Sequence, residues 1–161
     1  MVFPSRLSEI RALIIGRVSI IRSGTKKRIE EILRDYPKMD RYIHDRREEL
    51  MFPTKSEDEN VGGGKSSKIS KPQEQMLITI DEDKQLKALE REQEAVEISL
   101  ADSDADTNII AEELYFKEHP KYQMDGLIED ELIYCGRTQA FQKKSKLIRR
   151  IAKEMGLYDP Y

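Results

Sequence analysis

The sequence predicts an all-α protein, in which an N-terminal helical module precedes a C-terminal helix-turn-helix domain. Charged residues make up 37% and hydrophobic residues 38% of the 161 residues, against roughly 25% and 45–50% in typical globular proteins. The apolar residues recur every three or four positions, as on one face of an amphipathic helix. Proline and glycine fall between these periodic segments, where helices are expected to begin or end.

The first 24 residues contain an apolar stretch interspersed with arginines. A signal peptide needs an uninterrupted apolar region and a small-residue cleavage site. Arg17 interrupts the apolar stretch and no such cleavage site follows it. We therefore expect residues 1–24 to form an extension outside the helical module.

Residues 25–52 are expected to form a helical hairpin. Thr25 is a suitable N-cap, and the apolar residues of the first helix are Ile29, Ile32, Leu33 and Tyr36. Pro37 disfavours helical backbone in the residue before it, so the first helix should end near Asp35. The second helix carries its apolar residues on one side, at Met39, Tyr42, Ile43 and Leu50, and should end before Pro53.

Residues 53–72 are rich in Gly, Ser, Lys and acidic side chains, and this composition predicts a flexible linker. Its GGGKSS run resembles a phosphate-binding loop, but Glu59 stands where that motif needs glycine and no apolar strand precedes it. Residues 73–101 are expected to form one long helix, starting at Pro72 and bent near Thr79. Its apolar seam favours packing on the first two helices, with homo-oligomerisation as the weaker alternative.

Residues 107–161 show the order of elements typical of a helix-turn-helix domain. Asp106 or Thr107 can cap a helix that should end at His119–Pro120. A short helix over Met124–Leu132, a turn ending at Gly136 and a final helix from Arg137 to Met155 follow. The expected buried side chains of the final helix are Phe141, Leu147 or Ile148, Ile151 and Met155, and Gly156 is placed just after its end.

The final helix is the most basic segment of the chain, because residues 137–155 contain seven Lys or Arg against one acidic residue. In a helix-turn-helix unit, the N-terminal residues of the second helix read base edges in the major groove. Arg suits guanine and Gln suits adenine, because each offers paired hydrogen-bonding groups. The candidate DNA-binding residues are Arg137, Thr138, Gln139, Gln142, Lys143, Lys146, Arg149 and Arg150. The alternative is a basic face that only stays solvated.

No set of residues indicates catalysis, a metal or another cofactor, so we do not expect an enzyme. His44 and His119 lack companion ligands and Cys135 lacks a partnering histidine. The DSDAD run at 102–106 lacks the glycine and distal Glu of a calcium loop, and is interpreted as a capping turn. A single cysteine favours a reducing, cytoplasmic location, and no apolar run is long enough for a bilayer.

Several motifs in order resemble the RinA-type phage transcriptional regulators. They are KKRIEEILRDYPKMDRYI, DENVGGGKSSKISKP, EDKQLKALEREQEAVE, ELYFKEHPKY and the C-terminal helix-turn-helix, together spanning about residues 25 to 158. The C-terminal part of that family resembles region 4 of bacterial sigma factors. The resemblance implies a sigma region 4-like domain with Arg137 to Lys144 at the start of the recognition helix and Met124–Leu132 as the supporting helix.

The resemblance also implies a function: activation of phage late genes for packaging and virion structure in a bacterial host, with double-stranded DNA and bacterial RNA polymerase as partners. Two features depart from the usual pattern. Ile128 stands where a small residue is usual, and the segment LIYCG is less standard than a tight turn. Two alternatives stay open: a DNA-packaging protein similar to a terminase small subunit, and a helical adaptor that does not bind DNA and docks through residues 74–106.

Overall fold

The computed structural model describes residues 21–52 and 72–157, and every regular element in these two ranges is helical. The all-α prediction is therefore confirmed for this part of the chain. The elements are α2 (Ser23–Asp35), the short turn η1 (Tyr36–Lys38), α3 (Met39–Met51), α4 (Pro72–Glu82), α5 (Lys84–Ala101), α6 (Ala105–Ala111), the π-helical turn η2 (Glu112–Phe116), α7 (Met124–Glu129) and α8 (Arg137–Glu154). The expected extension up to residue 20 and linker residues 53–71 lie outside the described residues.

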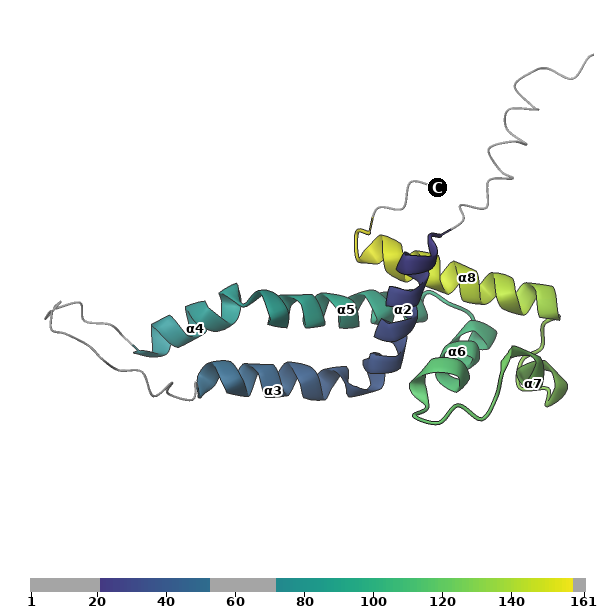
Figure 1. Cartoon of the computed structure of the whole chain (residues 1–161), viewed down its shortest axis with the longest axis horizontal. Helices are drawn as coiled ribbons and strands as arrows, with labels where there is room; N and C mark the ends of the chain where they lie inside the picture. Colours follow the sequence, from purple (N-terminus) through teal and green to yellow (C-terminus); the bar gives the residue numbers. More distant parts are fainter. Residues whose placement is uncertain (1–20, 53–71, 158–161) are drawn as a thin grey trace, which may run out of the picture.

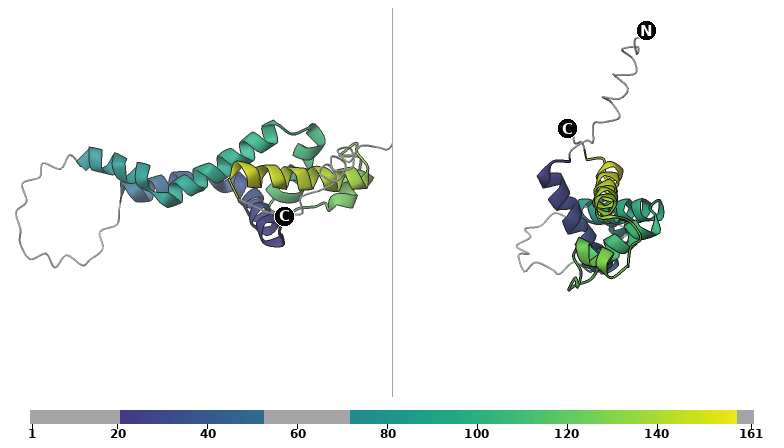
Figure 2. Two further views of the ribbon diagram at one scale, coloured as in Figure 1. Left: turned by 90° about the horizontal axis from the view of Figure 1, so that it is seen from above. Right: turned by 90° about the vertical axis from the view of Figure 1, so that its right-hand side faces the viewer.

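The helices form an arm and a body (Figure 1). In the arm, α3 runs beside α4 and the first half of α5, whereas the body joins α2, the end of α5, α6, α7 and α8. Figure 2 shows from a second direction that the arm extends away from the body. The basic helix α8 packs across α2, α5 and α6, so one of its faces is covered along much of its length.

Two clusters of buried side chains hold the body together. The larger one has buried members on α2, α3, α5, α6 and α8, including Ile32, Leu33, Val96, Leu147 and Ile151, and Ile80 of α4 packs against it. The smaller one joins α6, α7 and the start of α8; its buried members are Ile110, Met124, Leu127, Ile133, Cys135 and Ala140. Because the second cluster fixes α7 and the loop after it, it sets where α8 begins.

Polar contacts also anchor the buried side of α8 to α2. Lys144 Nζ lies 3.1 Å from Glu30 Oε1, and the Tyr115 hydroxyl donates to the same oxygen over 2.9 Å. Burial raises the pKa of the Glu30 carboxyl, but the hydrogen bonds from Tyr115 and Lys144 outweigh it and leave the pKa below its ordinary value. Lys144 therefore belongs to the packing of α8, not to its solvent face.

Several predicted helix ends are confirmed. Helix α2 ends at Asp35, before Pro37, and α4 begins at Pro72. Gly156 follows α8 with a φ of 66°, in the left-handed region that glycine adopts without strain. A Cβ added there would lie 2.9 Å from Arg91 Nη2, the end of a flexible side chain that can move aside, so the need for glycine comes from the backbone conformation.

The N-terminal segment is not a hairpin over residues 25–52. Helix α2 begins at Ser23, two residues before the expected Thr25 cap, and the side chain at its N-cap position, Arg22, accepts no hydrogen bond from the backbone of the first turn. The turn η1 then directs α3 away from α2, and Figure 1 shows the two helices running in clearly different directions. The apolar face of α3 packs on α4 and α5 instead, because these helices supply the larger partner surface.

The expected single helix over residues 73–101 is two helices, and the break is at Asp83, not near Thr79. The Asp83 carboxylate accepts the backbone N–H of Leu86 over 2.7 Å, which caps the start of α5. The Arg46 guanidinium of α3 donates two hydrogen bonds to the same carboxylate, over 3.2 and 2.7 Å. Together they make extended backbone at Asp83 more favourable than a continued helix.

Acidification should reveal the contribution of Asp83 to stability. The hydrogen bonds from Arg46 and the Leu86 N–H lower the pKa of Asp83 to about 2. Because this pKa is below the unfolded value of about 3.9, the stabilisation is complete above about pH 4 and is lost as the pH falls towards 2. Urea titrations at pH 7 and at about pH 3 give the free energy of unfolding at each pH. We expect this free energy to fall less between the two pH values for Asp83→Asn than for the wild type. Asp45→Asn, on an exposed residue of α3, is the control; equal pH dependence in wild type and Asp83→Asn would contradict the prediction.

Candidate nucleic-acid interface

Helix α8 divides into a buried face and a solvent face. The buried side chains are Ala140, Leu147, Ile148, Ile151 and Ala152. Phe141 was expected among them but is 45% exposed, and Ala140 is buried in its place. The reason is spacing, because position 140 lies seven residues before Leu147, on the same side of the helix, whereas position 141 is turned by about 100°.

The solvent face carries a stripe of five side chains opposite the buried face. The members follow one another at spacings of three and four residues and are Gln139, Gln142, Lys146, Arg149 and Lys153. None of these five side chains makes a hydrogen bond or an ion pair with another described residue. We call this set the α8 stripe. Its amide groups lie in the first half of the helix and its cations in the second.

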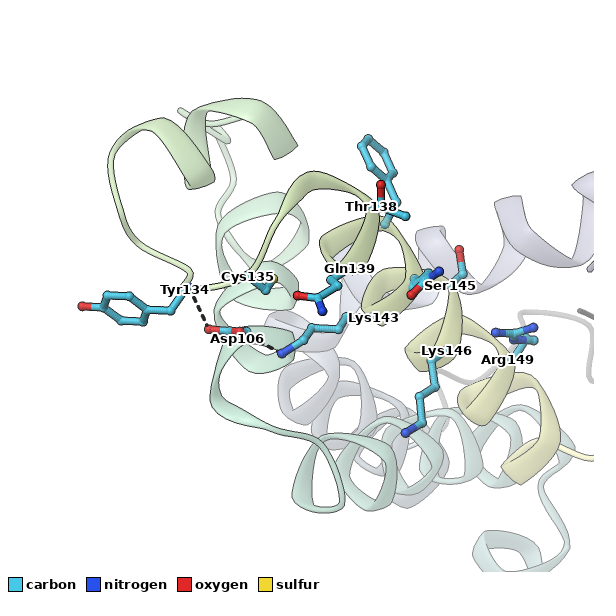
Figure 3. Close-up of a pocket in the computed structure, with 11 residues that line it drawn as sticks. Asp106, Tyr134, Cys135, Thr138, Gln139, Lys143, Ser145, Lys146 and Arg149 are labelled. Atoms are coloured by element: carbon cyan, nitrogen blue, oxygen red, sulfur yellow. Dashed lines mark hydrogen bonds and ion pairs between the residues drawn. The ribbon is translucent and has the colours of Figure 1, made fainter.

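An open groove follows the α8 stripe from Gln139 to Arg149, that is, along four of its five members (Figure 3). It has a volume of about 830 Å³. Six of the eight sequence-predicted residues line it: Thr138, Gln139, Gln142, Lys143, Lys146 and Arg149. Asp106, Tyr134, Cys135, Phe141 and Ser145 complete the lining, and Arg137 and Arg150 are not part of it.

Lys143 is held by two carboxylates at the start of α6. Its Nζ lies 2.5 Å from Asp104 Oδ2 and 2.8 Å from Asp106 Oδ2. The Lys143 hydrogen bond, followed by that from Thr107, lowers the pKa of Asp104 to about 2, and the same two carboxylates raise the pKa of Lys143. The positive charge of Lys143 is therefore neutralised locally, unlike the charges of the α8 stripe.

The two arginines outside the groove also have acidic partners. Arg137 Nε lies 3.0 Å from Asp125 Oδ1, and the Arg137 guanidinium lies 5.9 Å from the centre of the Phe141 ring. Arg150 pairs with the Asp102 carboxylate and donates to the Asp102 carbonyl over 2.8 Å. These contacts direct both side chains away from the α8 stripe, towards α7 and towards the acidic turn at 102–106.

The connection between α7 and α8 is longer and more ordered than a tight turn. Seven residues separate the two helices, and Glu131 adopts a left-handed φ of 53°. The Leu127 carbonyl accepts the backbone N–H groups of Leu132 and Ile133, over 3.0 and 3.3 Å. The Tyr134 N–H then donates to Asp106 Oδ1 over 3.2 Å. Consecutive backbone groups are thus fixed just before α8 starts.

Two features of this site were missed by the sequence analysis. One is the contact between the acidic turn and α8, in which the Asp104 and Asp106 carboxylates hold Lys143; the residue of this turn that caps α6 is Asp104, not Asp106 or Thr107. The other is Tyr134, whose side chain is 89% exposed. A capping role for the DSDAD run was predicted correctly, but nothing local in the sequence indicates a partner 39 residues away.

The remaining candidates from the sequence are Cys135, His44 and His119. Cys135 is buried, and burial raises the pKa of its thiol, which disfavours the reactive thiolate. His44 and His119 are both exposed. Within residues 21–52 and 72–157, no group of three or more His, Cys, Asp or Glu could hold a metal ion. None of the helices in the same ranges has the length and apolarity to cross a membrane.

A comparison with family models matches residues 25–153 to a family described as "Protein of unknown function (DUF722)". The chain belongs to the DUF722 family. The DUF722 match extends from the first turn of α2 to the last turn of α8, so it includes the arm, both buried clusters and the α8 stripe. No curated protein and no solved structure matches the chain.

In this DUF722 protein, Asp104 should matter more as a helix cap than as an ion-pair partner. Its carboxylate accepts the Thr107 N–H over 2.9 Å, and loss of such a cap costs about 0.5–2 kcal/mol. We expect Asp104→Ala to lower the free energy of unfolding by that amount in urea titrations. Asp104→Asn keeps a good capping group and should cost less. Equal losses for the two variants would assign the stabilisation to the ion pair with Lys143. This pair is expected to contribute little, because the Asp104 side chain is 55% exposed.

Proposed function

We propose that this protein is a sequence-specific DNA-binding transcriptional regulator, and that α8 is the helix that enters the major groove. The observation that carries the proposal is the α8 stripe: amides followed by cations on one solvent-facing side of a helix, without partners among the described residues. Solvated basic faces are common, but their cations are usually mixed with acidic residues. The α8 stripe contains none.

The order of side chains along α8 suits its two halves to different parts of duplex DNA. Gln139 and Gln142 near the N-terminus can form paired hydrogen bonds with adenine, and Thr138 can contact either base type. Lys146, Arg149 and Lys153 follow over the next two to three turns, where a helix leaving the groove meets phosphates. Because Arg137 is paired with Asp125, we assign base reading to the two glutamines.

The elements packed around α8 also suit the proposed placement of this helix on DNA. Helix α7 packs against α8 through the smaller buried cluster, as a supporting helix would. The acidic turn at 102–106 lies beside the α8 stripe and neutralises Lys143 and Arg150. The cations of α8 that are not neutralised therefore lie along one line, the α8 stripe. This arrangement favours a single orientation of the helix on a polyanion.

The resemblance to RinA-type regulators supports the biological part of the proposal. On that basis the protein activates phage late genes in the cytoplasm of a bacterial host, and RNA polymerase is its protein partner. The sigma region 4-like domain proposed for residues 107–161 begins within α6 and contains η2, α7 and α8.

Selection from a randomised duplex library tests the proposal directly. We would incubate the full chain with the library at about 0.15 M salt, where non-specific electrostatic binding is weakened, and sequence the retained duplexes. An enriched motif is the expected result. Retention of nothing above background would overturn the proposal and leave the α8 stripe as a solvated or protein-binding face, which is the adaptor alternative.

The selected motif then allows a prediction for the glutamines. We expect Gln139→Ala to lose about 1–3 kcal/mol of discrimination at one base pair of the motif, because the two hydrogen bonds between the glutamine amide and adenine are removed. Its affinity for unrelated duplexes should change little, since the side chain is uncharged. Lys87→Ala, which removes an exposed cation from α5, is the control and should leave the motif unchanged. Unaltered base preference for Gln139→Ala would assign base reading to other residues.

A further inference from the structure

Tyr134 is the most exposed of the large hydrophobic side chains that the structure describes, at 89%. Its neighbours on both sides are buried: Ile133 is 3% and Cys135 is 9% exposed, and both belong to the smaller buried cluster. The chain therefore holds the Tyr134 backbone against the body while its ring stays in solvent. Figure 3 shows the ring pointing away from α8, with the hydroxyl at its outer end.

The Tyr134 backbone is fixed more firmly than a loop position usually is. Its N–H donates to Asp106 Oδ1 over 3.2 Å, and the preceding N–H of Ile133 donates to the Leu127 carbonyl over 3.3 Å. Asp106 is fixed in turn by Lys143, over 2.8 Å. A side chain on such a support needs little additional ordering when it binds, so most of its contact energy is retained.

The position of Tyr134 relative to α8 indicates what its hydroxyl can meet. It precedes the first residue of α8 by three positions and lines the same groove as Thr138 and Gln139. A group that projects beyond the N-terminus of a helix in the major groove reaches the sugar-phosphate backbone at the edge of that groove. Tyrosine hydroxyls are among the groups that donate to phosphate oxygens in protein–DNA complexes.

We infer that Tyr134 is a DNA-contacting residue that positions α8 by donating its hydroxyl to a backbone phosphate. The inference rests on the proposed function and adds a contact from outside the helix to it. An uncharged donor of this kind fixes the register of the helix on the duplex without adding to the salt dependence, whereas each cation of the α8 stripe adds to it.

The test compares Tyr134→Phe, which removes only the hydroxyl, with Tyr134→Ala. The probe is a mixed-sequence duplex a few helical turns long, and the full chain is titrated over a series of salt concentrations around 0.1 M. We expect both variants to bind about 2- to 10-fold more weakly, as for one lost hydrogen bond, with an unchanged salt slope. Tyr42→Phe on α3 removes a hydroxyl from the arm and should bind like the wild type.

The other outcomes distinguish a failure of the Tyr134 phosphate contact from a failure of the proposed function. If Tyr134→Phe and Tyr134→Ala bind like the wild type while Arg149→Ala binds more weakly, the phosphate contact is overturned and the proposed function stands. If only Tyr134→Ala is weaker, the ring makes the contact and the assignment to the hydroxyl is overturned. If the wild type does not bind the duplex, the proposed function fails, and the inference fails with it.

A fluorescent variant gives a readout that does not depend on affinity. The chain contains no tryptophan, so Tyr134→Trp introduces a single indole at the inferred contact. We expect added duplex to shield this indole from acrylamide quenching, with the same midpoint as the binding curve. Unchanged quenching at saturating duplex would place residue 134 outside the interface.

Discussion

Replacing Ile151 by alanine is expected to lower the free energy of unfolding by about 2–5 kcal/mol. Ile151 is fully buried on α8 and belongs to the larger cluster, which joins α8 to α2 and α5. The substitution removes three carbon atoms from a site that neighbouring helices enclose, so a cavity adds to the lost transfer free energy. Small domains are stabilised by only about 5–15 kcal/mol in total, so a large part of the native stability would be lost.

Ile98→Ala on α5 is the matched control, because the same atoms are removed from a side chain that is 45% exposed. Alanine is the better helix former, so this change should be close to neutral. Urea titrations followed by circular dichroism measure both variants, and equal slopes with urea concentration make the free energies comparable. A loss for Ile151→Ala no larger than that for Ile98→Ala would mean that α8 is not packed against the body in solution.

The long amphipathic helices could be predicted because their signals are local. The stripe Ile29, Ile32 and Leu33 identifies α2 before any partner is known, and all three side chains are buried. Pro72 and Gly156 mark ends through their own backbone preferences, which do not depend on tertiary structure. The proposed DNA-binding residues could be placed together for the same reason, since they share one helix.

The break at Asp83 could not be predicted, because it depends on Arg46 of another helix, 37 residues away. Residues 73–101 by themselves have the composition of a continuous helix. The direction of α3 likewise depends on which surface its apolar face meets, and that surface belongs to α4 and α5, which begin at residue 72. Such choices are made by tertiary packing, which overrides local propensity.

In the candidate site, too, features set by local spacing could be predicted and features set by tertiary contacts could not. The helical spacing correctly places Gln139, Gln142 and Lys146 on one groove. It does not show that Lys143 is held by Asp104 and Asp106, since these carboxylates lie 39 and 37 residues earlier in the chain. The exposure of Tyr134 also depends on the loop conformation, which follows from the buried neighbours on either side of it.

Removing Lys146 and Arg149 together is expected to weaken binding to a mixed-sequence duplex roughly 60-fold at about 0.1 M salt. Neither side chain has a partner among the described residues, so each is available to a phosphate. Each neutralised phosphate adds about 0.9 to the slope of log affinity against log salt, and at about 0.1 M this amounts to roughly eightfold in affinity. Two lost contacts should therefore also reduce the slope by about 1.8.

The double variant should fold like the wild type, because both residues lie on the face of α8 opposite its buried side chains and alanine favours helix there. Lys84→Ala combined with Lys87→Ala is the matched control, since it removes two exposed cations from the first turn of α5. Two positive charges near a helix N-terminus oppose the helix dipole, so their removal does not destabilise α5. If both double variants lose the same affinity, binding depends on the charge of the whole chain and not on α8. If only the control variant is weakened, the arm makes the contact. A loss confined to Lys146 and Arg149 would place the duplex on the α8 stripe, because net charge is equal in the two variants and only the position of the missing cations differs.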